Sequence, residues 1–186
     1  DQSISYLPTP AWFVEPLSFE SSNLPIISIN TNGLSISDES RIVADMGIID
    51  NGTGSRNLIN DSFNNYNGKI SIETRGESSQ GLFPKKSYRI ETQDALGNNL
   101  NVSLLGMPEE NDWILYAPYT DKTLMRDVLT YKMGNDMGRY APRTRFVELV
   151  LNGYYQGIYV LIEKIKVDKN RVAIASLNPV DISGEE

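Results

Sequence analysis

Two runs of alternating apolar and polar residues, at 69–75 and 85–91, flank a short connection in the middle of the chain. In the first run Ile70 and Ile72 fall on one face and charged residues fall on the other. Alternation with a period of two is typical of half-buried antiparallel strands, so the pattern predicts a β-hairpin. The connection at 76–81 is small and polar, which lets its backbone approach a ligand closely.

The second run places a lysine on the face expected to point inward. Lys86 is in phase with Tyr88 and Ile90, whereas Lys85 is in phase with the polar set. A lysine on the inner face must reach out to water, pair with a carboxylate or bind a buried anion. A small-residue loop followed by an inward lysine is how kinase-like folds hold nucleotide phosphates. A lysine at a sheet edge that reaches water is the alternative, and spacing alone leaves both open.

The clearest helical pattern covers about residues 122–137, with Thr120 or Asp121 placed to cap its first turn. Apolar side chains recur there at helical spacing, which predicts an amphipathic helix whose stripe packs on the core. Arg126 and Asp127 project away from most of this stripe, either toward a ligand or second lobe or into solvent. The stripe consists of Leu124, Met125, Val128, Leu129, Tyr131 and Met133.

A second hairpin is predicted by two apolar runs at 144–151 and 154–162, which Asn152-Gly153 joins. Asn-Gly between two such runs is a strong signal for a two-residue turn. Glu148 interrupts the first run on its apolar face. A buried carboxylate needs a cation, for which Lys86 is one candidate, and an edge position exposed to water is the alternative.

Composition restricts the chemistry open to the chain. Its 186 residues contain neither cysteine nor histidine, which excludes disulfides, thiolate catalysis, zinc–thiolate sites and a Ser–His–Asp triad. The net charge of −7 and the lack of a basic run argue against a nucleic-acid or anionic-membrane partner. No apolar stretch approaches the roughly 18 residues of a membrane-spanning helix, and no signal peptide is recognised.

The order of these elements predicts an α+β fold, an antiparallel β-sheet with one main amphipathic helix. We expect an extended lead-in at 1–23, a folded body at 24–166 and a connector at 167–186. The body has the element order of a kinase amino-terminal lobe: phosphate loop, lysine strand, helix, two strands and hinge. The Gly-x-Gly-x-x-Gly and Val-Ala-Ile-Lys strings of ordinary protein kinases are missing. Further strands are expected at 24–29, 41–50 and 112–116.

Several linked stretches within about residues 24–166 resemble the CotH kinase family, which comprises spore coat protein H and its secreted bacterial relatives. They are RGESS at 75–79, PKKSY at 84–88, LLG at 104–106, DWIL at 112–115, DKTLMR at 121–126, APRTRF at 141–146 and LNGYYQGIY at 151–159. Family members are atypical protein kinases of the secretory type. The resemblance therefore implies an amino-terminal, nucleotide-binding lobe that uses ATP with Mg²⁺ or Mn²⁺, in a protein that is secreted or lies on a cell surface or spore coat.

Carried over by position, the resemblance also implies roles for individual residues. Lys86, with Lys85 as the alternative, would neutralise the phosphates, and Arg75 and Arg126 are weaker candidates for the same region. Glu163 would begin the connection, ending at residue 165, against which the adenine lies. The loop that covers the phosphates would include Gly76, Ser78, Ser79 and Gly81.

Phosphoryl transfer also needs one carboxylate to orient the hydroxyl and another to hold the metal. No Asp-x-x-x-x-Asn or Asp-Phe-Gly string is present, so no catalytic or metal-binding residue is assigned here. We expect this 186-residue chain to bind nucleotide without turnover, and the protein substrate stays undefined. The alternative, since fold does not fix function, is a non-catalytic surface or assembly module on the same fold.

Overall fold

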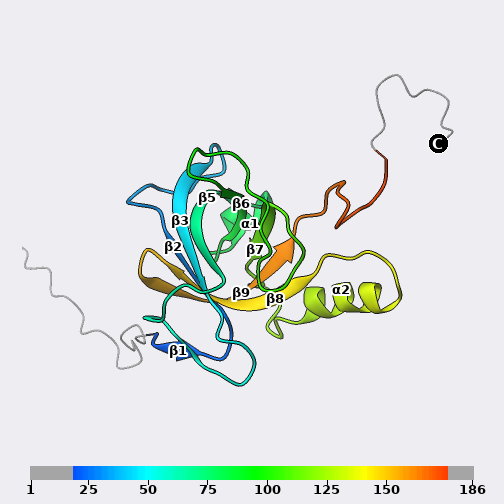
Figure 1. The fold of residues 1–186 in the computed structure, drawn as a ribbon, viewed down its shortest axis with the longest axis horizontal. Coiled ribbons are helices and arrows are strands. Elements are labelled where there is room, and N and C mark those ends of the chain that lie inside the picture. Colours follow the sequence, from blue (N-terminus) through cyan, green and yellow to red (C-terminus); the bar gives the residue numbers. More distant parts are fainter. Residues whose placement is uncertain (1–18, 176–186) are drawn as a thin grey trace, which may run out of the picture.

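The computed structural model describes residues 19–175, which form a closed β-barrel of seven strands (Figure 1). The strands run around the barrel in the order β2-β3-β5-β6-β7-β9-β8, and β1 pairs with β4 in a separate two-stranded sheet. The strands are β1 (Ser21–Ser22), β2 (Ile26–Asn30), β3 (Ile42–Ile49), β4 (Asn57–Leu58), β5 (Tyr66–Arg75), β6 (Ser87–Gln93), β7 (Asp112–Tyr116), β8 (Thr144–Leu151) and β9 (Tyr154–Glu163). The helices are α1 (Ser78–Leu82) and α2 (Arg126–Asp136).

The barrel closes where β2 pairs in parallel with β8, from Ile26 opposite Glu148 to Ile29 opposite Leu151. All other neighbouring strands in the barrel are antiparallel. Closure removes the open sheet edges that would otherwise be free to pair with another chain. The strands alternate between the barrel interior and its outer face, so the interior is filled by their own side chains. Its largest member is Trp113, which is fully buried and donates its indole N–H to the Glu110 carbonyl at 3.0 Å.

The predicted α+β fold, with a main amphipathic helix against a kinase-lobe sheet, is wrong, because the described chain is mostly β-structure in a closed barrel. Helix α2 has no buried residue and lies to one side of the barrel (Figure 1). Only its Val128 and Tyr131 pack against the outer barrel face. The physical reason is that the strands fill the interior themselves, so the core does not need a helix. The apolar side chains Met125, Leu129, Met133 and Met137 are instead half exposed or more.

The predicted cap at Thr120 or Asp121 is wrong, because the N-cap of α2 is Met125 and no side chain caps it. The Asp121 carboxylate accepts hydrogen bonds from the backbone N–H groups of Thr123 (3.0 Å) and Arg126 (2.9 Å). Only Arg126 of these two belongs to α2, so Asp121 satisfies one N–H of the first helical turn from the segment that precedes the helix. The helix itself begins at Arg126, later than the spacing predicted, because Leu124 adopts a positive φ of 60°.

Both predicted hairpins are confirmed. Strands β5 and β6 pair from Lys69 opposite Gln93 to Arg75 opposite Ser87. Strands β8 and β9 are joined by Asn152-Gly153, whose φ angles of 52° and 81° are both positive, as a type I′ turn requires. The strands expected at 24–29, 41–50 and 112–116 correspond to β2, β3 and β7.

The predicted domain limits are only partly covered by the structure. Most of the lead-in at 1–23 and the end of the connector at 167–186 lie outside the described residues. The described part of the connector folds back, with a bridge between Val167 and Val172. Across residues 19–175, neither helix has the length and apolar character needed to cross a bilayer.

Candidate functional site

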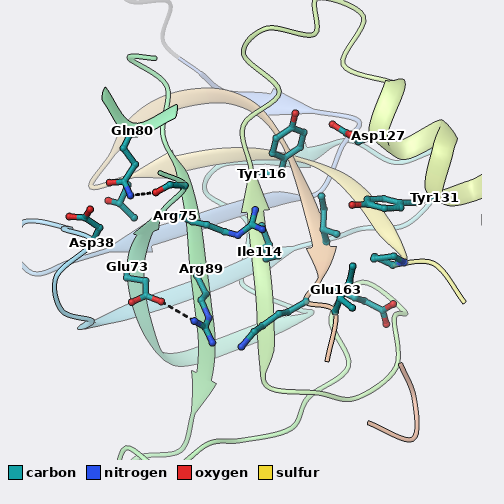
Figure 2. Close-up of a pocket in the computed structure, with 16 residues that line it drawn as sticks. Asp38, Glu73, Arg75, Gln80, Arg89, Ile114, Tyr116, Asp127, Tyr131 and Glu163 are labelled. Atoms are coloured by element: carbon teal, nitrogen blue, oxygen red, sulfur yellow. Dashed lines mark hydrogen bonds and ion pairs between the residues drawn. The ribbon is translucent and has the colours of Figure 1, made fainter. Parts of the chain in front are cut away.

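A cavity of about 680 Å³ lies on the outer face of the barrel between the α1 loop and α2 (Figure 2). We call it the main cavity. Two apolar strand residues line this cavity, Ile114 of β7 and Ile162 of β9. Tyr131 and Asp127 of α2 bound one side, and Arg75 extends across from β5 on the other (Figure 2).

Two segments that are distant in sequence meet at this cavity. Arg75, Gly76 and Gln80 line it from the loop after β5, and residues 163–165 line it from the segment that leaves β9. The Gln80 side chain donates a hydrogen bond to the Gly76 carbonyl, which holds the loop in a tight bend. Gly76 has a φ of 114°, and a Cβ there would collide with the Ser79 hydroxyl. Only glycine fits this bend.

A smaller cavity of about 200 Å³ adjoins the main one and shares Arg75, Gly76, Gln80 and Tyr116 with it. We call it the basic cavity. Its other lining residues include Lys85 and Lys86 together with several hydroxyl side chains, and no Asp or Glu is among them. In a chain of net charge −7, so local an excess of positive charge favours an anion. The hydroxyls belong to Ser79, Ser87, Tyr116, Tyr119 and Thr120.

Lys86 is partly buried, and its ammonium faces the serine-bearing loop. The Nζ donates to the carbonyl of Phe83 at 2.6 Å and also to the carbonyl of Gln80. The backbone carbonyl of Lys86 accepts a hydrogen bond from the Tyr159 hydroxyl at 2.9 Å. The residue therefore lies at the predicted place beside the loop, with two loop carbonyls as its partners.

Lys85 points into the molecule more deeply than its phase predicts. Its Nζ donates to the Ile158 carbonyl at 2.6 Å and lies 4.4 Å from the centre of the Tyr159 ring, a cation–π arrangement. Burial lowers the pKa of Lys85, and the negative charge of Glu148 partly opposes this. Because β6 begins only at Ser87, the strand alternation does not extend back to either lysine.

Glu148 differs from both readings that the sequence left open. It is buried on the outer face of β8, and its carboxylate accepts hydrogen bonds from the hydroxyls of Ser22 (2.8 Å) and Tyr155 (2.6 Å). Burial and the Glu148 carboxylate together raise the pKa of the Tyr155 phenol. Phe19 stacks on the Tyr155 ring, with centroids 4.3 Å apart. Hydroxyl donors, instead of the Lys86 cation, satisfy this carboxylate.

The acidic side chains of the main cavity differ in how fully they are engaged. Glu163 is fully buried and forms an ion pair with Arg143 at 2.7 Å, and Glu73 pairs with Arg41 at 3.2 Å and Arg89 at 3.4 Å. Burial and the neighbouring Asp127 carboxylate raise the pKa of Tyr116 to about 12. The phenol of Tyr116 is therefore neutral and can donate a hydrogen bond at neutral pH.

A buried arginine that the sequence did not indicate fixes the wall formed by residues 163–165. Arg171 donates to the carbonyls of Asp112 at 2.8 Å and Lys164 at 2.7 Å, and its guanidinium lies over the Trp113 ring. Lys164 also forms an ion pair with Asp112 at 3.1 Å. These contacts hold the segment after β9 against β7. The only sequence signal for Arg171 was its place in a cluster of basic residues within a polar run.

The structure brings only some of the predicted site residues together. Arg75, Gly76 and Glu163 line the main cavity, and Ser79 and Lys86 line the basic cavity with the first two. Three of the predicted site residues, Ser78, Gly81 and Arg126, line neither cavity. The side chain of Arg126 is 78% exposed, and its Nε lies 3.6 Å from the Asp121 carboxylate. Over residues 19–175, no three Asp or Glu side chains are grouped so as to hold a metal ion.

The family model described as CotH kinase protein matches residues 72–181, more than half of the chain. The chain belongs to the CotH kinase protein family. This confirms the resemblance inferred from the sequence motifs, all of which lie between residues 75 and 159. The CotH match begins within β5 and includes the loop after it, α2 and the β8–β9 hairpin, so it contains nearly all of the residues around both cavities. Comparison with curated proteins gave no match.

Proposed function

We propose that this CotH-family chain provides the nucleotide-binding part of an ATP-dependent phosphotransferase. The observation that supports it is the meeting of the loop at 76–81 and the segment at 163–165 around one cavity. The volume of the main cavity falls within the roughly 300–1,000 Å³ that is usual for small-molecule sites.

The adenine base is assigned to the end of the main cavity at the segment after β9. Ile114 and Ile162 offer apolar surface there, and Ile165 is 59% exposed beside them. A planar aromatic base gains free energy by covering such surface. The wall itself is rigidly placed by the contacts of Arg143 and Arg171.

ATP binds to proteins together with a divalent cation, which usually keeps several waters and takes only one or two protein carboxylates besides the phosphate oxygens. The residues present fit that role. Asp127 and Asp38 line the main cavity, and among residues 19–175 neither carboxylate is in an ion pair. Figure 2 shows these two side chains at opposite sides of the cavity, so either Asp127 or Asp38 alone would hold Mg²⁺ or Mn²⁺, whose chemistry is to neutralise phosphate charge.

Calorimetric titration of the chain with ATP and Mn²⁺ tests the proposal, with Ile165→Ala as the site variant. The matched control is Val167→Ala, an exposed apolar residue in the same segment that lines neither cavity. We expect micromolar to millimolar binding that Ile165→Ala weakens about threefold to tenfold, as loss of several buried methylene groups implies, and that Val167→Ala leaves unchanged. A radiolabel transfer assay on the same samples reports whether binding is accompanied by turnover.

The competing proposal is a non-catalytic surface or assembly module. It has the support of the family resemblance and of the apolar, exposed side of α2. The wild-type chain would then show no heat of binding for ATP, with or without Mn²⁺. The same family resemblance supports a secreted or cell-surface location.

A further inference from the structure

We propose that Arg75 is the cation that contacts the phosphate chain of the nucleotide, and that Lys86 is a positioning residue that holds the loop at 76–83 over the site. This division of roles rests on the proposed function. It reverses the ranking that the family resemblance and strand phase together gave to these two residues. The contacts made by the two side chains support this division of roles.

Two of the three donors of Lys86 are already in use. An ammonium has three N–H donors, and two of them point at the carbonyls of Gln80 and Phe83. Gln80 lies in the last turn of α1, and Phe83 directly follows it. Carbonyls at a helix end have no intrahelical partner, and a cation placed there satisfies them. Lys86 thus stabilises a short helix that has no buried residue and no side-chain cap of its own.

Arg75 is in the opposite situation. Within the described chain its guanidinium forms no hydrogen bond and no ion pair, although both cavities are lined by this residue. Figure 2 shows the guanidinium extended over the cavity floor toward Ile114. A guanidinium carries five N–H donors in a planar fork that matches phosphate oxygens. An arginine left without partners at the junction of two cavities is therefore available to bind an anion.

The distribution of charge around the two cavities favours one orientation of the bound nucleotide. The main cavity is lined by four carboxylates (Asp38, Glu73, Asp127, Glu163) and three cations (Arg75, Arg89, Lys164), whereas the basic cavity is lined by three cations and no carboxylate. Like charges repel across such short distances, so the anionic part of a ligand is favoured on the basic side. The phosphate chain would then point from the main cavity past Arg75 toward α1, with the base at residues 163–165.

The test combines binding with amide hydrogen exchange on the whole chain. Titrations use ATP with Mn²⁺ and, as a probe without a base, inorganic tripolyphosphate, at two salt concentrations. The variants are Arg75→Ala, Lys86→Ala and the conservative Lys86→Arg. The charge control is Lys169→Ala, an exposed lysine that lines neither cavity.

We expect opposite patterns for the two residues. Arg75→Ala should weaken both probes at least tenfold, as loss of a charge-assisted contact implies, and flatten the salt dependence, while exchange of the loop amides at 79–83 is unchanged. Lys86→Ala should accelerate exchange of those amides in the ligand-free protein and weaken both probes with the salt dependence kept. Lys86→Arg should restore slow exchange, because a guanidinium can also donate to two carbonyls.

Other outcomes overturn one proposal or the other. Wild-type affinity in Arg75→Ala, or unchanged loop exchange in Lys86→Ala, would refute the division of roles even if ATP binds. ATP that binds no more tightly than tripolyphosphate would refute the nucleotide site and leave the division of roles standing. Absence of binding for both probes in the wild-type chain would refute both.

Discussion

The two hairpins of the barrel are similar in their strands and different in their connections. Strands β8 and β9 are joined by two residues whose backbone angles match their residue types, Asn152 and Gly153. Strands β5 and β6 are joined by residues 76–86, which fold into a short helix held by contacts from Gln80 and Lys86. The tight turn is specified locally and supports the fold, whereas the long connection depends on side-chain contacts and supports the site.

Strand β7 lies between these hairpins in the barrel, paired with β6 on one side and β9 on the other. Substitutions in the β8–β9 hairpin should therefore reduce stability, and substitutions in the connection at 76–86 should mainly affect binding.

The largest effect is expected at the base of the β8–β9 hairpin, where Arg143 pairs with the fully buried Glu163. Arg143→Ala leaves a buried carboxylate without its cation, which should cost about 3 kcal/mol of unfolding free energy. Urea denaturation followed by circular dichroism measures this. Arg139→Ala, which removes an exposed arginine, is the control and should change stability little. Equal midpoints for the two variants would show that the ion pair does not stabilise the hairpin.

The next effect is expected at the tight turn itself. Gly153 has a φ of 81°, a conformation that costs an L-residue about 1–2 kcal/mol. Gly153→Ala should therefore lower the unfolding free energy by about that amount, with no change in ATP affinity. Thermal denaturation and calorimetry check the two parts separately. If Gly153→Ala lost ATP binding at unchanged stability, the view that the tight turn supports the fold and the long connection supports binding would be wrong.

A pH-dependent effect is expected at Asp112, on the strand between the hairpins. Burial acts to raise the pKa of Asp112, but the ion-paired hydrogen bonds from Lys166 and Lys164 together outweigh it and hold this pKa below the usual value of 3.8. A pKa depressed in the folded state stabilises the protein above about pH 4, and this contribution is lost as the pH falls further.

Asp112→Asn should therefore destabilise the protein at pH 7 and progressively less between pH 4 and pH 2. Urea titrations of both proteins across this range give the difference directly. A difference that stays constant with pH would mean that the charge of Asp112 is not responsible.

The smallest effect is expected in the long connection. Gly81 lies in α1, has no positive φ, and a Cβ added there would meet no other atom within 4 Å. Gly81→Ala should change the unfolding free energy by less than about 0.5 kcal/mol, in contrast to Gly153→Ala. A loss comparable to that of Gly153→Ala would show that the connection supports the fold after all.

The parts of the structure that could be predicted are those encoded by neighbouring residues. Alternation in β5 and β6 and the Asn152-Gly153 turn gave both hairpins with nearly correct limits. Barrel closure could not be predicted in this way, because it joins Ile26 to Glu148 through pairing between distant segments. The apolar stripe of α2 gave a helix, but a stripe alone does not reveal whether a partner surface exists to cover it.

In the candidate site, too, contacts between distant segments were harder to predict than features of neighbouring residues. Family resemblance indicated the loop and the segment after β9, and the structure places both at one cavity. The ranking of Lys86 above Arg75 rested on the family resemblance and on strand phase. The strand begins only at Ser87, so its phase does not reach the lysines. Arg171 contacts backbone carbonyls across the chain, and no sequence spacing specifies such a contact.

The parallel pairing of β2 with β8 has a consequence for how the protein is made. During synthesis β2 emerges early, and it must wait for the translation of almost the whole barrel before its second neighbour exists. Until then its isoleucines and one row of backbone amides stay open to wrong partners. Contacts so distant in sequence slow folding, so closure of the barrel should be a late step in folding.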